Sequence, residues 1–215
     1  MSLQFYLQHS TFKIALALSA ALSPLAWLAW LALRDDLGAN PIERVTHFTG
    51  DWALRFLLLT LAITPLRRLT GWNGLISYRR MLGLAAFFYG SLHFLTWIGV
   101  DHLFDWEAIA QDIRKRPYVT AGFTGFACML PLAITSTRGW VRRLGKRWAQ
   151  LHTLVYAAAV AGVVHYFWLV KADTRLPLTY AAVLAVLFGA RLWSRARPAA
   201  AVSRHEAAPP AVERG

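Results

Sequence analysis

The sequence has little acid and almost no cysteine. Asp and Glu number 11 against 23 Lys and Arg among 215 residues, and Cys128 is the only cysteine. A single cysteine excludes an intramolecular disulfide, a CxxC redox motif and a cysteine-ligated iron–sulfur cluster. The formal charge of +12 is compatible with nucleic-acid binding, but the basic residues cluster in short segments between apolar runs. That distribution is typical of a polytopic membrane protein and argues against a nucleic-acid partner.

Long runs without charge predict an all-α, multi-pass membrane protein. Hydrophobic residues make up 57% of the chain, and runs of about 20 apolar residues can cross a lipid bilayer as helices. We expect a six-helix transmembrane bundle with spans at 14–33, 52–66, 81–100, 118–137, 148–170 and 176–190. The second span is short and is expected to extend upstream, with Arg55 snorkelling toward the membrane surface.

Charge asymmetry between the loops predicts the orientation. Segments 67–80 and 138–147 carry basic but no acidic residues, whereas 34–51 and 101–117 are mixed. The positive-inside rule therefore places both termini in the cytoplasm. We expect a cytoplasmic N-terminus at 1–13, a transmembrane domain at 14–193 and a disordered cytoplasmic tail at 194–215. A short interfacial helix is expected at 106–113, and no repeat of fixed period is found.

Histidines inside the spans are the candidate site. An ionisable ring in hydrocarbon is costly, so it normally faces the bundle interior with a partner. Each ring could simply bond a neighbouring helix, but two in one span and a third at matching depth favour haem iron. These three are His93, His152 and His165, and His9, His47, His102 and His205 are expected to be solvated or structural.

Helix rise sorts the three rings by depth. His93 lies eight residues before Asp101, about 12 Å, and His165 lies six residues before Lys171, about 9 Å, from the same predicted side. These two can therefore ligate one iron from opposite faces. His152 lies about 8 Å from the cytoplasmic end, too far away to share that iron.

A second haem at the level of His152 lacks an obvious second ligand. Arg80, 13 residues before His93, has no free acceptor. Arg79 and Arg80 could pair with haem propionates or another anion, although the positive-inside rule explains them equally. Thirteen helical residues turn His152 and His165 to different faces, so a distortion near Gly162 would be needed to align them.

Several short segments resemble a known family. They are HFTG at 47–50, ITPL at 63–66, RRMLGL at 79–84, LH at 92–93, RPY at 116–118, TST at 135–137, LGKRW at 144–148, LH at 151–152, VY at 155–156 and HY at 165–166. Over about residues 10 to 193 the chain resembles the MsrQ (YedZ) family of haem-binding membrane subunits, within the wider ferric-reductase-like transmembrane family.

The resemblance implies cofactors and partners. It implies haem b, with one haem or two, and FMN, with His93, His152 and His165 as ligand candidates. It also implies electrons from membrane quinol and delivery to a periplasmic molybdenum reductase, MsrP, that repairs oxidised methionine. Related NADPH oxidases use two histidine pairs, and this sequence departs from them because Arg80 stands where a fourth ligand would.

The residues themselves support a non-catalytic electron-transfer subunit. No Gly-rich dinucleotide fingerprint follows a strand, so the electron donor is expected to be lipid-borne or a separate protein, and the acceptor a partner. A proton-coupled transporter using the histidines as relay groups is the alternative, although spans three to six contain no Asp or Glu to partner them. A structural scaffold, with packing histidines, is the third hypothesis.

Overall fold

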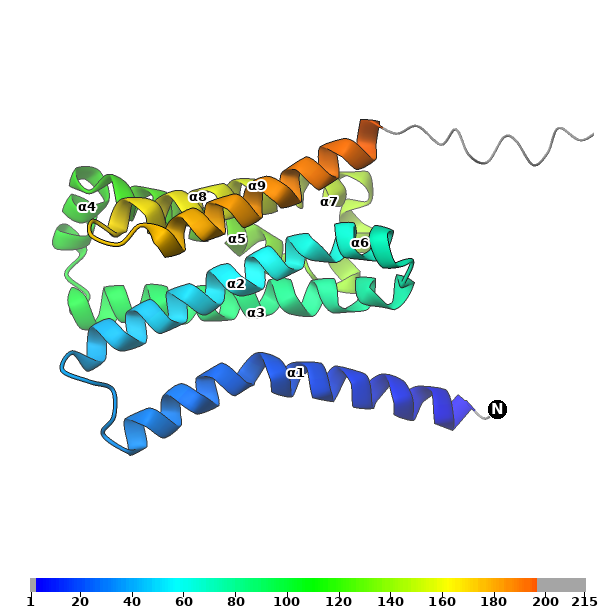
Figure 1. Cartoon of the computed structure of the whole chain (residues 1–215), viewed down its shortest axis with the longest axis horizontal. Helices are drawn as coiled ribbons and strands as arrows, with labels where there is room; N and C mark the ends of the chain where they lie inside the picture. Colours follow the sequence, from blue (N-terminus) through cyan, green and yellow to red (C-terminus); the bar gives the residue numbers. More distant parts are fainter. Residues whose placement is uncertain (1–2, 197–215) are drawn as a thin grey trace, which may run out of the picture.

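The computed structural model describes residues 3–196, and every regular element in that part of the chain is helical (Figure 1). The six long helices are α1 Leu3–Leu33, α2 Pro41–Thr70, α3 Ile76–Thr96, α5 Pro117–Ile134, α8 Leu154–Leu169 and α9 Arg175–Ala196. Shorter ones are η1 Asn73–Leu75, the π-helical turn η2 Trp97–Asp101, α4 Trp106–Lys115, α6 Arg138–Leu144 and α7 Lys146–Leu151. The predicted all-α class is confirmed, and the predicted tail lies mostly outside the described residues.

Five segments of the described chain are long and apolar enough to cross a membrane. They are Ala15–Leu33, Asn73–Asp101, Pro117–Ile134, Lys146–Leu169 and Arg175–Trp193. Helix α2 has 30 residues, which reach about 45 Å, but Asp51 and Arg55 lie among its apolar residues. The sixth span and the positions of the termini therefore stay predictions.

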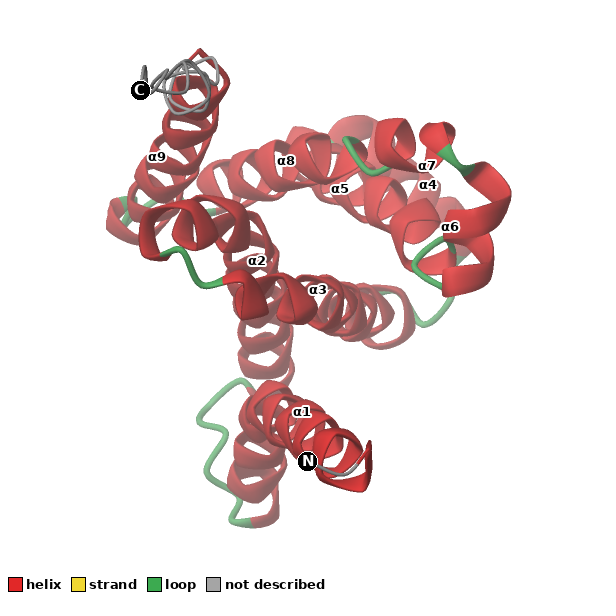
Figure 2. Cartoon of the chain, turned by 90° about the vertical axis from the view of Figure 1, so that its right-hand side faces the viewer, coloured by secondary structure: helices red, strands yellow, loops and turns green. Residues whose placement is uncertain are grey.

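Two closely packed helix pairs make up the centre of the fold. Helix α2 packs along α3, and α5 packs along α8. Figure 2 shows the two pairs on opposite sides, with α9 beside α2 and α8 and with α1 beyond the α2–α3 pair. Small residues permit the close approach: Ala86, Ala158 and Ala159 are fully buried between helices. The core also includes Leu54, Phe56, Leu57, Leu58, Leu61, Tyr89, Val155, Val163 and Leu184.

The fifth predicted span is not one continuous helix. Helix α7 ends at Leu151, His152 and Thr153 form a turn, and α8 begins at Leu154. At this turn the backbone N–H groups of Thr153 and Val155 donate to carbonyls three residues earlier, which tightens the chain. Helix α8 runs unbroken through Gly162, so the distortion there that would be needed to align His152 with His165 is absent from this helix.

Helix α1 is linked to the bundle at its internal proline. Pro24 has no N–H to donate, and the carbonyl of Ala20 accepts from the Ser23 hydroxyl instead, at 2.9 Å. One residue further on, the fully buried Tyr89 hydroxyl of α3 enters the α1 backbone. It accepts from Leu25 N–H at 3.1 Å and donates to the Ala21 carbonyl at 3.0 Å. A side chain thus replaces a helical hydrogen bond at a Pro-containing turn.

Removing the hydroxyl in Tyr89→Phe should weaken the attachment of α1. Two buried backbone groups lose their bridge, and we expect a loss of about 1–3 kcal/mol in the free energy of unfolding. Thermal unfolding in detergent, followed by circular dichroism, measures this. Tyr78→Phe is the control, since the structure gives the Tyr78 hydroxyl no hydrogen bond, and an equal shift in both variants would contradict the bridge.

Candidate functional site

Helices α3 and α8 bring together the two histidines that helix rise places at one depth. The ring centres of His93 and His165 lie 6.0 Å apart, and the planes make an angle of 76°. Each residue stands in the last turns of its helix, at the end of the bundle that also carries α4 (Figure 1). The two helix pairs therefore face each other through their imidazoles.

Each ring is fixed by one hydrogen bond to the neighbouring helix of its own pair. His93 Nδ1 lies 2.8 Å from the Thr46 carbonyl oxygen in α2, and His165 Nδ1 lies 2.7 Å from the Tyr118 carbonyl oxygen in α5. A carbonyl can only accept, so Nδ1 carries the proton in both rings. Each Nε2 is left with its lone pair, which is the form of imidazole that binds a metal.

Glycines make room for both rings. Gly50 and Gly122 each stand four residues after the residue whose carbonyl accepts the hydrogen bond from the ring. In an α-helix the same carbonyl also accepts from the backbone N–H of the residue four positions later, which here is the glycine. A Cβ on Gly50 would lie 3.0 Å from His93 Nδ1, and one on Gly122 would lie 2.7 Å from His165 Nδ1. Sequence reasoning missed both glycines. Their positions four residues after Thr46 and Tyr118 carry meaning only once the histidine contacts are known.

The two halves of the site correspond residue by residue. Each member of the α5–α8 set stands 72 residues after its α2–α3 counterpart: Thr46 and Tyr118, Gly50 and Gly122, Ala86 and Ala158, Gly90 and Gly162, His93 and His165. This structural repeat contradicts the expectation that the chain has none. At the same spacing of 72 residues Arg80 corresponds to His152, so the two halves differ at this position.

The geometry suits a metal held between two imidazoles. Rings on opposite sides of one metal, each with a metal–nitrogen distance of about 2.0 Å, have centres roughly 6 Å apart. The observed separation is 6.0 Å. His93 and His165 could supply two nitrogens to one metal, as the protein does in haem sites that have two histidine ligands.

His152 stands apart from this pair. It occupies the turn after α7, and its ring stacks on Trp148 with centres 3.8 Å apart. Its Nδ1 lies 3.1 Å from the Trp148 carbonyl, and Trp148 Nε1 donates to the Thr135 carbonyl at 2.9 Å. Among the described residues no other histidine contacts it, so the structure does not bring the third predicted ligand to the first two.

A cavity lies near the same end of the bundle as His152. It has a volume of about 570 Å³ and is enclosed by α1, α3 and the start of α6. Arg80 and Arg138 line one part of it, and apolar side chains of α1 and α3 line the rest. Arg80 therefore has access to a space that could hold an anionic group.

Comparisons with known proteins show the family to which the chain belongs. Residues 49–163 match the family described as ferric reductase like transmembrane component. A protein-methionine-sulfoxide reductase heme-binding subunit MsrQ of Xanthomonas euvesicatoria is 48% identical over 91% of this chain and 93% of its own. The subunit of the same name in Herminiimonas arsenicoxydans is 54% identical over 81% of each chain. The chain belongs to the MsrQ family. No solved structure matches it.

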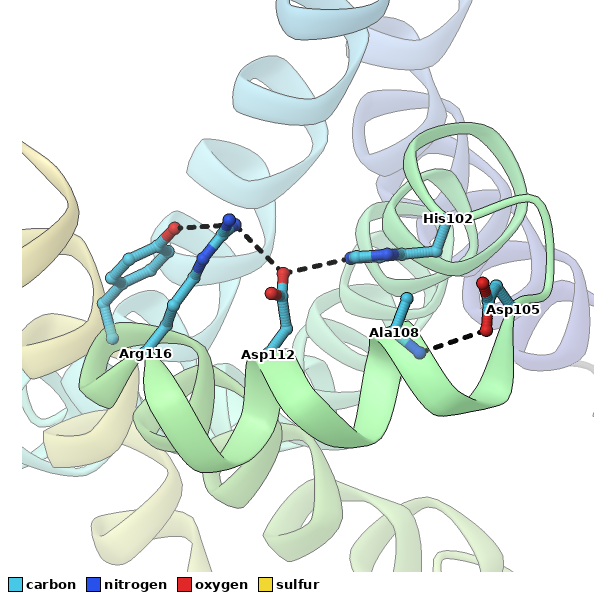
Figure 3. Close-up of polar contacts among 6 residues, drawn as sticks. His102, Asp105, Ala108, Asp112 and Arg116 are labelled. Atoms are coloured by element: carbon cyan, nitrogen blue, oxygen red, sulfur yellow. Dashed lines mark hydrogen bonds and ion pairs between the residues drawn. The ribbon is translucent and has the colours of Figure 1, made fainter.

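The MsrQ-family chain has a polar cluster beside the histidine pair. Asp112 of α4 binds both His102 Nε2, at 3.1 Å, and Arg116 Nη1, at 3.0 Å (Figure 3). Asp105 caps α4 by accepting from the backbone N–H groups of Glu107 and Ala108. His102 was expected to be structural, and it connects the turn after α3 to the interfacial helix that the sequence predicted. Helix α4 is thereby held against the start of α5, next to Tyr118.

Asp112→Ala should loosen α4. The Asp112 side chain is 14% exposed, and loss of one partner from such a group costs about 1–3 kcal/mol. We expect faster tryptic cleavage at residues 114–116 in the detergent-solubilised protein. Asp101→Ala is the control, because Asp101 is exposed and has no ion pair in the structure. Unchanged cleavage of the Asp112 variant would show that the cluster does not hold this helix.

Proposed function

We propose that the chain is the electron-transfer subunit of a protein-methionine-sulfoxide reductase system, with a haem b ligated by His93 and His165. The spacing of the two rings carries this proposal: centres 6.0 Å apart, with both Nδ1 atoms bound to carbonyls. The names of the relatives, heme-binding subunits of such reductases, support it.

The protein residues prepare the ligands. Bound haem would supply one-electron redox chemistry. The carbonyls of Thr46 and Tyr118 select the tautomer, hold each ring in place and increase the basicity of Nε2. Gly50 and Gly122 let the rings approach these carbonyls. Burial by the two helix pairs keeps water from the ligands, which also influences the reduction potential.

Donor and acceptor lie outside this chain. The donor in this proposal is membrane quinol and the acceptor is a periplasmic molybdenum-containing subunit, MsrP. By the positive-inside rule the basic loops 67–80 and 138–147 favour the cytoplasmic side, so in this proposal the histidine pair lies in the periplasmic half of a bacterial inner membrane, close to such an acceptor. Six spans and cytoplasmic termini follow if α2 also crosses the bilayer.

A further cofactor would belong at the opposite end of the bundle. His152, half-buried and stacked on Trp148, is the candidate for a second haem ligand. FMN is also part of the proposal, with no residue assigned to it. Arg80 and Arg138, at the cavity near that end, have the charge that a propionate or a flavin phosphate requires.

The contacts of the rings favour ligation over a transporter's proton relay. A relay requires partners that gain and lose protons. In the structure His93 Nδ1 and His165 Nδ1 both meet backbone carbonyls, which do neither. A neutral imidazole with Nε2 free is suited to a metal.

His93→Ala or His165→Ala should remove the haem between these residues. Each change deletes one of two axial ligands, and pyridine haemochrome assay of the purified protein measures the haem-to-protein ratio. His102→Ala is the control and should retain that haem. In the unchanged protein, rings inclined at 76° should give a strongly anisotropic low-spin EPR signal. Full haem content in the double variant would exclude this ligand assignment.

Gly122→Ala should lower haem occupancy without removing a ligand. The new Cβ would lie 2.7 Å from His165 Nδ1, so the ring must leave its carbonyl, and loss of such a ligand-orienting bond typically costs about 10–100-fold in affinity. Haem titration of the apoprotein measures this. Gly189→Ala is the matched control, because nothing lies within 4 Å of a Cβ there. Equal affinities in both variants would contradict the role of Gly122.

A further inference from the structure

Helix α2 carries an ion pair beside the histidine site. Arg55 Nη2 lies 3.6 Å from Asp51 Oδ2, and Arg55 Nε donates to the Tyr180 hydroxyl of α9 at 2.9 Å. Tyr166 of α8 lies close to Asp51, and its ring centre is 5.8 Å from that of Tyr180. The expected snorkelling of Arg55 is thus replaced by contacts within the bundle. Asp51, Arg55 and Tyr180 are called the α2–α9 cluster below.

The α2–α9 cluster lies at the depth of the histidine pair. Asp51 directly follows Gly50, which abuts His93, and Tyr166 directly follows His165. Pro41 begins α2 ten residues before Asp51, or about 15 Å along the helix. The predicted second span begins only at residue 52, but Gly50 abuts His93, which lies about 12 Å inside the predicted third span, so the charges stand deeper than that prediction placed them.

Charges at this depth indicate function. They are costly in hydrocarbon, and where they occur they mark proton or substrate sites. This pair is not sealed in the core either: the side chains of Asp51 and Arg55 are 28% and 41% exposed. The separation of 3.6 Å is longer than a hydrogen bond, so the guanidinium has donors to spare for another acceptor.

We propose that the α2–α9 cluster binds the headgroup of a membrane quinol and that Asp51 takes up the proton the quinol releases. This inference rests on the proposed function, in which quinol is the donor. Arg55 and the Tyr180 hydroxyl supply donors for a quinone oxygen, and the Asp51 carboxylate accepts from a quinol hydroxyl. The exposed side of the pair lets a lipid-borne ring approach from the bilayer.

The reaction balances with haem as oxidant. Oxidation of one quinol breaks two O–H bonds and gives the quinone, two protons and two electrons. A ferric haem held by His93 and His165 would accept the electrons one at a time and would pass the first to the acceptor before taking the second. Each proton passes to the Asp51 carboxylate and then to water on the side of α2 where His47, one helical turn away, is exposed. Asp51 is ready for the next proton once it has released the first.

A cavity between α5 and α8 is a weaker candidate for this headgroup. It holds about 720 Å³ between α5 and α8 and is lined by Thr120, Thr124 and Tyr156, among others. Both threonine hydroxyls donate to main-chain carbonyls, of Ile113 and Thr120 respectively. The cavity has no carboxylate to take a proton. Tyr156 therefore offers a matched control for Tyr180.

The test follows haem reduction in stopped flow, with haem-loaded protein in nanodiscs. Decylubiquinol is one reductant and dithionite, which needs no quinol site, is the other. Asp51→Asn should slow reduction by decylubiquinol about 100-fold, as expected for loss of a proton acceptor. Tyr180→Phe should slow it about 5-fold, for one lost hydrogen bond. Haem content and dithionite reduction should match the unchanged protein, and Tyr156→Phe should behave like it with both reductants.

The outcomes separate this inference from the proposed function. If decylubiquinol fails to reduce even the unchanged protein, the quinol donor and the cluster's role fall together. If it reduces Asp51→Asn and Tyr180→Phe at the unchanged rate, only the cluster's role is overturned. Slowing by Tyr156→Phe alone would place the headgroup between α5 and α8 and also overturn it. Should Asp51→Asn lose its haem, Tyr180→Phe decides alone.

Discussion

Two hydrogen bonds, from the imidazoles of His93 and His165 to main-chain carbonyls, hold the candidate site in place, and the packing of the helix pairs serves them. They require that a helix carbonyl already engaged in its own helix accept a second donor, which its second lone pair allows. They also require that the residue four positions later have no side chain in the way, which explains Gly50 and Gly122. In return both rings keep the lone pair on Nε2, and their centres lie 6.0 Å apart. The close packing of α2 on α3 and of α5 on α8 is what keeps each carbonyl within reach.

The internal repeat explains why two histidines make the same kind of hydrogen bond. The positions at which the two halves differ explain why the two ends of the bundle are not equivalent. The two histidines and the glycines beside them recur in both halves, whereas at the same spacing of 72 residues Arg80 corresponds to His152 and Asp51 to Phe123. One end of the bundle thus has a pair of histidines, and the other has one histidine with arginines. The Asp51–Arg55 pair within α2 has no counterpart at the equivalent positions of α5, where Phe123 replaces Asp51. Under the proposed function, these differences would give electron flow a preferred entrance.

The depth of the histidines in the membrane could be predicted from the sequence, but the direction in which each side chain points could not. Counting residues from loop charges placed His93 and His165 at one level, since helix rise is nearly constant. The helix face predicted for His152 assumed an unbroken helix. The turn at His152 and Thr153 interrupts that helix, so the assumption does not hold. Gly50 and Gly122 were overlooked because a glycine in a membrane helix has many uses, and only the partner identifies which one applies. The repeat was overlooked because side chains away from the ring contacts are free to differ.

Helix α2 shows how hydropathy and function oppose each other. Its failure to qualify as an apolar span comes from residues such as Asp51 and Arg55, which sit at the depth of the histidines. A helix selected only for insertion would replace them with leucine, at a gain of several kcal/mol in hydrocarbon. Their retention beside Gly50, within a helix that otherwise buries Leu54, Phe56 and Leu57, means that the fold accepts this cost at one place. That place adjoins His93 and His165, where the proposed function requires proton release and electron transfer to be coupled.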